Sequence, residues 1–172
     1  KELGVVGMLA VEMFDTPGGL VINELAMRPH NSGHWSIEGA RTSQFENHLR
    51  AVLDMPLGGP RPRQPIAVMV NILGGDLPDL HIAFRHVMAR DPGLKIHLYG
   101  KDVRPGRKVG HVTALGDDEQ ALRDGFAEQA ALDLSRSDRI PVDRGHIAYL
   151  VAEAPDTRRG LLLSSSYEYP GR

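Results

Sequence analysis

The stretch NELAMRPHNSGHW, residues 23–35, is the most informative part of this chain. Within thirteen residues it supplies a carboxylate, an arginine, two histidines, two asparagines and the single tryptophan of the sequence. An apolar run, residues 20–22, leads into it, and a helix with a capping signal follows. A strand end that delivers this many polar groups into a glycine-containing loop is where sites are often built. Any one of these residues alone would indicate a polar surface turn, but the whole set favours a site.

The composition is that of an ordinary globular protein. Hydrophobic residues make up 41% and charged residues 24% of 172 residues, enough for one domain or a domain with a small neighbour. The net charge of -2 gives no general attraction to nucleic acid or membrane. The absence of cysteine excludes disulfides and thiolate chemistry. No apolar run is long enough to span a membrane, and residues 1–7 resemble a strand, not a signal peptide. We therefore expect a cytoplasmic setting and a chain that begins inside a larger protein.

Residues 4–26 predict a β-hairpin. Residues 4–14 are nearly all apolar and indicate a strand that is buried on both faces. Residues 15–19, DTPGG, are a strong turn signal, and residues 20–26 resume the strand pattern. The two strands are expected to pair across a five-residue loop.

Two glutamates interrupt this apolar hairpin. If Phe14 pairs with Leu20, Glu12 and Glu24 share one face as a diagonal pair, with Cα atoms about 7–8 Å apart. Two such carboxylates repel each other unless something cationic lies between them, and hard oxygen ligands suit Mg²⁺. A register slip of one residue would place the glutamates on opposite faces and remove this argument. In the alternative interpretation, both point into solvent from an edge hairpin.

The remainder of the chain alternates between helices and strands. Residues 43–46, SQFE, have the form of a capping box, and the helix that follows has an apolar stripe expected to face the core: Phe45, Leu49, Val52 and Leu53. Residues 61–65 complete a segment rich in proline and glycine and mark the best internal boundary. Beyond it we expect strands at 67–73, 95–99 and 109–115, and helices at 78–90 and 117–134. Residues 135–172 indicate a short hairpin or a loose tail.

A second polar stretch, residues 101–108, is a basic loop between strands. It has one carboxylate and four cations, namely Lys101, Arg104, Arg107 and Lys108. Clustered cations on a tight turn can hold a phosphate, and arginine is well suited to bind two oxygens at once. The alternative is an ordinary solvated turn. The stretch is too short for a nucleic-acid surface, and no aromatic residues interleave it.

These motifs, taken in order, resemble the N5-carboxyaminoimidazole ribonucleotide synthase family of ATP-grasp enzymes. The resemblance covers about residues 3–134 and corresponds to the C-terminal part of the enzyme. The matching segments are residues 23–24, 28–35, 38–40, 43–46, 48–50 and 104–111.

The resemblance implies an α+β fold in two parts. Residues 1–57 would be the C-terminal half of an ATP-grasp domain, an antiparallel hairpin plus helix with the metal and bicarbonate site. Residues 58–134 would be a small C-terminal domain of β-sheet and helices with a phosphate-binding loop, and residues 135–172 remain an unassigned tail. The implied ligase phosphorylates bicarbonate with ATP to carboxyphosphate, and the amine of 5-aminoimidazole ribonucleotide then captures the carboxyl unit.

The family also implies roles for particular residues. Its Mg²⁺ (or Mn²⁺) ligands correspond to Glu12 and Glu24, with Asn23 beside them. The residues around bicarbonate and the aminoimidazole correspond to Arg28, His30 and Asn31. The cations that hold the ribonucleotide phosphate correspond to Lys101 and Arg107, with Arg104 and Lys108 adjacent. The expected partners are small molecules, with no nucleic acid and no membrane, and the full-length enzyme is expected to be a homodimer.

The sequence departs from the family's pattern in two respects, and two alternative functions remain open. The family's N-terminal domain and most of its ATP-clamping domain have no counterpart here, so this chain alone is expected to be inactive. Met27 stands where the family usually has proline. A formate-dependent ATP-grasp glycinamide ribonucleotide transformylase shares the Arg-Pro-His motif, but residues 31–34 and 104–111 fit the carboxylase better. The other alternative is a non-catalytic fragment that binds a ribonucleotide.

Overall fold

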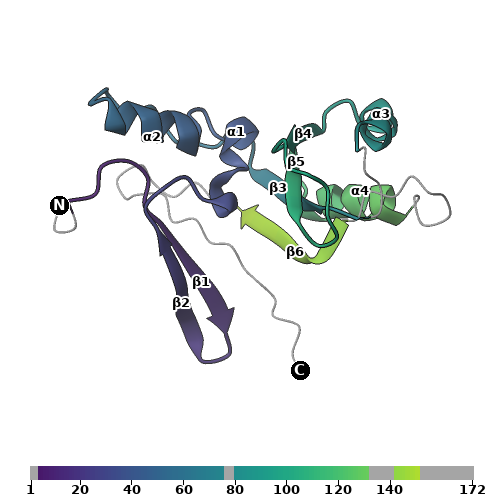
Figure 1. Cartoon of the computed structure of the whole chain (residues 1–172), viewed down its shortest axis with the longest axis horizontal. Helices are drawn as coiled ribbons and strands as arrows, with labels where there is room; N and C mark the ends of the chain where they lie inside the picture. The colour runs from purple at the N-terminus through teal and green to yellow at the C-terminus, as the bar shows by residue number, and fades with distance from the viewer. Residues whose placement is uncertain (1–3, 76–79, 132–141, 152–172) are drawn as a thin grey trace.

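The computed structural model describes residues 4–75, 80–131 and 142–151 (Figure 1). It has the expected α+β class, with a separate two-stranded hairpin and a four-stranded sheet flanked by helices. Among these residues, no helix combines the length and the apolar character needed to cross a lipid bilayer.

The N-terminal hairpin consists of β1 (Ala10–Thr16) and β2 (Gly19–Ala26). Its turn has two residues rather than the expected five, and Gly19 adopts a φ of 106°, which favours glycine. The hairpin projects from the rest of the molecule (Figure 1). The prediction that its first strand is buried on both faces is wrong. Large apolar side chains are exposed on both strands, at Val11, Leu20, Val21, Ile22 and Leu25.

The register of the hairpin differs from the predicted one. Phe14 pairs with Val21 rather than with Leu20, and a β-bulge next to Glu12 shifts the ladder again. Glu12 therefore lies directly opposite Glu24 instead of diagonal to it. The two shifts together move the partner of Glu24 by two residues, and a shift of two keeps a side chain on the same face. The sequence therefore predicted correctly that Glu12 and Glu24 share a face, but it predicted the wrong pairing partners.

Three short helices follow the hairpin: η1 (Asn31–Gly33), α1 (Ser36–Gly39) and α2 (Gln44–Val52). The Oγ of Ser43 accepts a hydrogen bond of 3.1 Å from the backbone N–H of Glu46, as the capping signal predicts. The expected core stripe of this helix is not buried. Its exposed members are Leu49, Val52 and Leu53.

The second part of the chain is an antiparallel sheet in the order β4-β5-β3-β6. Its elements are β3 (Ile66–Leu73), α3 (His81–Arg90), β4 (Lys95–Leu98), β5 (Lys108–Gly116), α4 (Glu119–Ala131) and β6 (Val142–Val151). β6 lies in the segment for which the sequence indicated a hairpin or a loose tail, and its backbone pairs with β3. The rest of that tail lies outside the described residues.

The sheet has two different faces because side chains alternate along each strand. One face forms the apolar core with α3 and α4, and includes Val68, Val70, Ile72, Phe84 and Phe126. The other face of β3 packs Ala67 and Met69 against Trp35. This second face also carries buried polar residues, namely Asn71, His111 and Thr113. The polar turn predicted from the sequence therefore lies against the polar part of a sheet.

Candidate functional site

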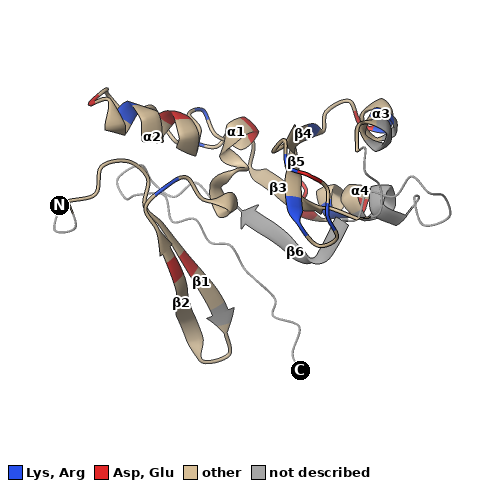
Figure 2. Ribbon diagram, viewed as in Figure 1, with Lys and Arg blue, Asp and Glu red and all other residues tan. Residues whose placement is uncertain are grey.

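The centre of the site is a pair of facing carboxylates with a histidine between them. His30 Nε2 lies 2.9 Å from Glu24 Oε1 and 3.2 Å from Glu12 Oε2. Asn23 Nδ2 donates a hydrogen bond of 2.7 Å to the other oxygen of Glu12. Acidic residues on the two hairpin strands lie side by side (Figure 2), and one ligand atom from each of Glu12, Glu24 and His30 lies within 4.8 Å of the others. Two hard carboxylates placed in this way fit the oxygen preference of Mg²⁺ or Mn²⁺.

His30 is held by the first turn of α2. Its backbone N–H donates to Gln44 Oε1 at 3.0 Å, and Gln44 Nε2 donates to the His30 carbonyl at 2.7 Å. Its Nδ1 lies 2.9 Å from the Oγ of Ser32. Only 7% of His30 is exposed. Gln44 had no role predicted from the sequence, because nothing in the local spacing shows that its amide reaches fourteen residues back.

Gln44 also fixes the ring of His34. Its Nε2 lies 2.9 Å from His34 Nδ1, which accepts the second amide hydrogen when that nitrogen carries no proton. Burial, with repulsion from His30 and Lys108, lowers the pKa of His34 to about 4. The imidazole is therefore neutral at pH 7, as this hydrogen bond requires.

Arg28 lies beside the carboxylate pair and is open to solvent. Its Nη2 is 3.8 Å from Glu24 Oε1, and its Nη1 donates to the Pro29 carbonyl at 3.1 Å. With 61% of its side chain exposed, the guanidinium can turn toward an anion that enters beside Glu24.

Asn31 connects the turn to the sheet. Its Nδ2 donates to Asn71 Oδ1 at 3.0 Å, and Lys108 Nζ donates to Asn31 Oδ1 at 3.3 Å. Burial, together with repulsion from Lys101, lowers the pKa of Lys108, while Glu12 opposes that shift. Asn71 was missed, although one amide in a strand of otherwise apolar residues was a signal that could have identified it.

The basic loop is anchored by its backbone. Gly74 N–H donates to the Arg107 carbonyl at 2.7 Å, and Gly106 N–H donates to the Gly74 carbonyl at 2.9 Å. The guanidinium groups of Arg104 and Arg107 lie 3.4 and 3.9 Å from Asp102 Oδ2; Arg104 and Asp102 are largely exposed, and Arg107 is 41% exposed. The structure thus gathers these groups on one loop (Figure 2).

The two lysines of the loop make different contacts. Lys101 Nζ lies 5.2 Å from the centre of the Tyr99 ring. In the part of the chain that the structure describes, Lys108 is the loop cation that hydrogen-bonds to residues 28–31. Lys101, Arg104 and Arg107 remain on the loop itself.

A further polar cluster lies on the same sheet face and received no role from the sequence. His97 Nε2 lies 2.7 Å from Glu38 Oε1, and Tyr99 Oη lies 2.8 Å from His111 Nδ1. Burial, with repulsion from His97 and His34, lowers the pKa of His111 to about 3, and burial raises the pKa of Tyr99 to about 12. We call the side-chain hydrogen bonds that Asn31 and Glu38 make with the sheet the seam. Its members are Asn31–Asn71, Asn31–Lys108 and Glu38–His97.

Two segments of the chain match models of known protein families. Residues 1–45 match the model of the ATP-grasp domain, and residues 67–125 match that of the phosphoribosylaminoimidazole carboxylase C-terminal domain. The N5-carboxyaminoimidazole ribonucleotide synthase of Mycobacterium bovis is 59% identical over 125 residues, which cover 70% of this chain. They cover only 29% of that protein, so the chain spans less than a third of this curated relative.

Solved structures show the same similarity. The N5-carboxyaminoimidazole ribonucleotide synthetase from Thermus thermophilus aligns with a TM-score of 0.61 at 49% identity, covering 76% of this chain and 34% of that one. The synthase from Aspergillus clavatus, in complex with ADP and 5-aminoimidazole ribonucleotide, aligns with a TM-score of 0.65 at 38% identity. That alignment covers 73% of this chain and 34% of the other. These matches confirm the resemblance and the fold class expected from the sequence.

Proposed function

Because the chain is homologous to the C-terminal part of the N5-carboxyaminoimidazole ribonucleotide synthases, we propose that it supplies half of an active site for carboxylating 5-aminoimidazole ribonucleotide. In this reaction, ATP phosphorylates bicarbonate to carboxyphosphate and leaves as ADP. The amine of the ribonucleotide then attacks the carboxyl carbon, phosphate leaves, and the amine nitrogen loses a proton. The observation that carries the proposal is the convergence of Glu12, Glu24 and His30 beside Asn31 and Lys108.

Glu12 and Glu24 would hold the divalent cation that accompanies ATP, with Asn23 fixing one oxygen of Glu12. When bound, Mg²⁺ or Mn²⁺ supplies positive charge that offsets the charge of the transferring phosphoryl group. Because the hairpin places the two carboxylates directly opposite each other, they can hold one ion without a change of register.

Arg28, Asn31 and His30 would act on the one-carbon anion and the amine. The planar guanidinium of Arg28 offers paired donors to the oxygens of bicarbonate or carboxyphosphate, and the Asn31 amide adds a neutral donor. His30 Nε2 shares its proton with the Glu24 carboxylate, so it can receive the proton that leaves the attacking amine once its own proton has passed to that carboxylate.

The basic loop would bind the phosphate of the ribonucleotide through Lys101, Arg104, Arg107 and Lys108. Lys108 supports this assignment because it also contacts Asn31, so a phosphate on the loop would lie near the carboxylation centre. The proposal places the ATP-grasp portion in residues 1–57 and the C-terminal domain in residues 58–134. It places the reaction in the cytoplasm and the full-length enzyme in a homodimer, as the resemblance implies.

The test is a substitution in a full-length synthase that carries this C-terminal segment. Glu24→Gln removes one negative charge from the proposed cation site, and we expect it to abolish bicarbonate-dependent ATP hydrolysis. Glu46→Gln, an exposed carboxylate on α2 that pairs with Arg50, is the matched control and should retain activity. If Glu24→Gln hydrolyses ATP at the normal rate, the metal assignment is wrong.

A calorimetric titration separates this proposal from the fragment alternative. 5-Aminoimidazole ribonucleotide is added to the 172-residue chain with and without MgATP. Binding that does not need the nucleotide supports the fragment alternative. Loss of that binding in Lys101→Ala with Arg107→Ala supports the assignment of the phosphate site to the basic loop. Arg90→Ala, at the end of α3, is the control. Binding of glycinamide ribonucleotide instead would favour the transformylase.

A further inference from the structure

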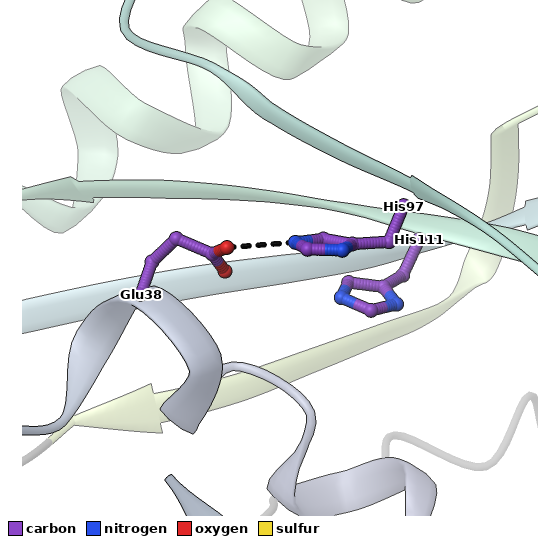
Figure 3. A group of neighbouring side chains, drawn as sticks. All are labelled: Glu38, His97 and His111. Atoms are coloured by element: carbon purple, nitrogen blue, oxygen red, sulfur yellow. Dashed lines mark hydrogen bonds and ion pairs between the residues drawn. The ribbon is translucent and has the colours of Figure 1, made fainter. Parts of the chain in front are cut away.

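We propose that Glu38, His97 and His111 form a second metal site, distinct from the carboxylate pair, which takes a borderline divalent cation such as Zn²⁺. The three residues come from α1, β4 and β5, and converge where the helix lies against the sheet (Figure 3). One ligand atom from each lies within 4.8 Å of the other two. The site does not depend on the proposed carboxylation.

Two buried atoms of the cluster have no hydrogen-bond partner among the described residues. These atoms are His111 Nε2 and Glu38 Oε2. His111 is 1% exposed, so its nitrogen cannot reach bulk water. A buried polar atom without a partner costs about 1–3 kcal/mol, and native proteins normally avoid that cost. A cation bound between the carboxylate and the imidazole would satisfy both atoms at once.

The types of ligand atom indicate the class of metal. Two imidazole nitrogens and a carboxylate are a common ligand set for Zn²⁺, whereas Mg²⁺ prefers oxygen ligands alone. Three protein ligands also leave a fourth tetrahedral position for water. The carboxylate pair on the hairpin is richer in oxygen, so the two sites should differ in metal preference.

The far side of the His111 ring already has the hydrogen bond that a metal-binding histidine needs. Tyr99 Oη lies 2.8 Å from His111 Nδ1, the ring nitrogen that faces away from Glu38. If Nδ1 carries the proton and donates it to Tyr99, the lone pair lies on Nε2, where it can bind a cation. Metal-binding histidines usually make such a hydrogen bond through their other nitrogen.

Binding requires two local changes. The rings of His97 and His111 are stacked, with centroids 4.6 Å apart and planes 18° from parallel (Figure 3). Because each lone pair lies in its ring plane, the rings must rotate about their Cβ–Cγ bonds to point both nitrogens at one ion. The cation also replaces any proton shared between His97 Nε2 and Glu38 Oε1, so uptake at a pH where that proton is bound should release it.

Titration of the 172-residue chain with Zn²⁺ and with Co²⁺ tests the site. Millimolar Mg²⁺ is present throughout to compete for the carboxylate pair, and Glu24→Gln measures any Zn²⁺ that still binds there. We expect uptake of about one equivalent of Zn²⁺ per chain, a rise in the melting temperature, and proton release that calorimetry in two buffers can measure. Glu38→Gln and His97→Gln should each weaken Zn²⁺ binding at least about tenfold.

Two control variants identify the site that takes up the metal. His48→Gln alters a histidine on α2 that accepts from the Met8 N–H, and it should leave Zn²⁺ affinity unchanged. Glu24→Gln should also leave it unchanged. The proposal is overturned if the unsubstituted chain takes up no Zn²⁺, whatever the fold of the variants. It is equally overturned if uptake is lost in Glu24→Gln but not in His97→Gln.

Discussion

At the scale of single residues, Trp35 fixes the polar turn against the sheet. It is 2% exposed and packs with Ala40, Ala67 and Met69. We expect Trp35→Ala to lower the free energy of unfolding by about 3–5 kcal/mol, because it leaves a large cavity. Urea denaturation of the isolated chain measures this. Leu57→Ala, at a residue that is 66% exposed, should change stability little; an equal loss there would show that Trp35 has no special role.

The neutral state of His34 makes stability depend on pH. Its pKa is about 4 in the folded chain and 6.5 by its ordinary value, so the unfolded chain binds more protons between these limits. Stability should therefore be complete above about pH 6.5 and decline toward pH 4. The slope should be a fraction of about 1.4 kcal/mol per pH unit, since a half-buried imidazole is partly screened.

Denaturation midpoints at several pH values measure that slope. His34→Gln should reduce it, because glutamine does not titrate in this range and the contribution of His111 remains, whereas the control His48→Gln should leave it unchanged. An unchanged slope in His34→Gln would assign the pH dependence to other groups.

At the scale of elements, the basic loop depends on a close backbone approach. A Cβ at Gly74 would meet the backbone oxygen of Arg104, so Gly74→Ala must displace the loop. We expect this variant to lose ribonucleotide binding in the calorimetric titration while the chain stays folded. Gly59→Ala is the matched control, since a Cβ there meets nothing within 4 Å. If Gly74→Ala binds normally, the loop does not need this geometry.

The elements themselves were largely predictable, whereas the contacts between them were not. Glu12 and Glu24 were placed on one face because strand alternation survives a two-residue error in register. The bulge that sets their true pairing has no clear signature in the sequence. Glu38 and His97 are separated by 59 residues, and no periodic pattern shows that a helix and an edge strand will bring them together.

The burial of apolar side chains was also predicted poorly from the sequence. Apolar periodicity shows which side chains favour an interior, but it cannot show what covers them. The exposed residues Ile22 and Leu53 illustrate this for the hairpin and for the end of α2. In the sheet, β3 was predicted as an apolar strand, and its central residues are buried on both faces.

At the scale of the whole molecule, the two parts should differ in local stability. An isolated two-stranded hairpin is at best marginally stable in water, whereas β3 is central in a sheet with a core. Amide hydrogens of β3 and β5 should therefore exchange at least about a hundredfold more slowly than those of β1 and β2. Hydrogen exchange with mass spectrometry measures this. Equal protection would mean that the hairpin is stabilised by contacts the described residues do not show.

The seam has a consequence for anyone who recombines relatives of this protein. Each of its hydrogen bonds has one partner before residue 60 and the other after it, and the partners are chemically specific. A chimera that joins the residues before position 60 of one homologue to the sheet of another takes the two partners of each hydrogen bond from different proteins. Unless both hydrogen-bonding partners come from the same homologue, a buried amide or carboxylate loses its partner. Amino-acid substitutions on the two sides of residue 60 should therefore be correlated among relatives.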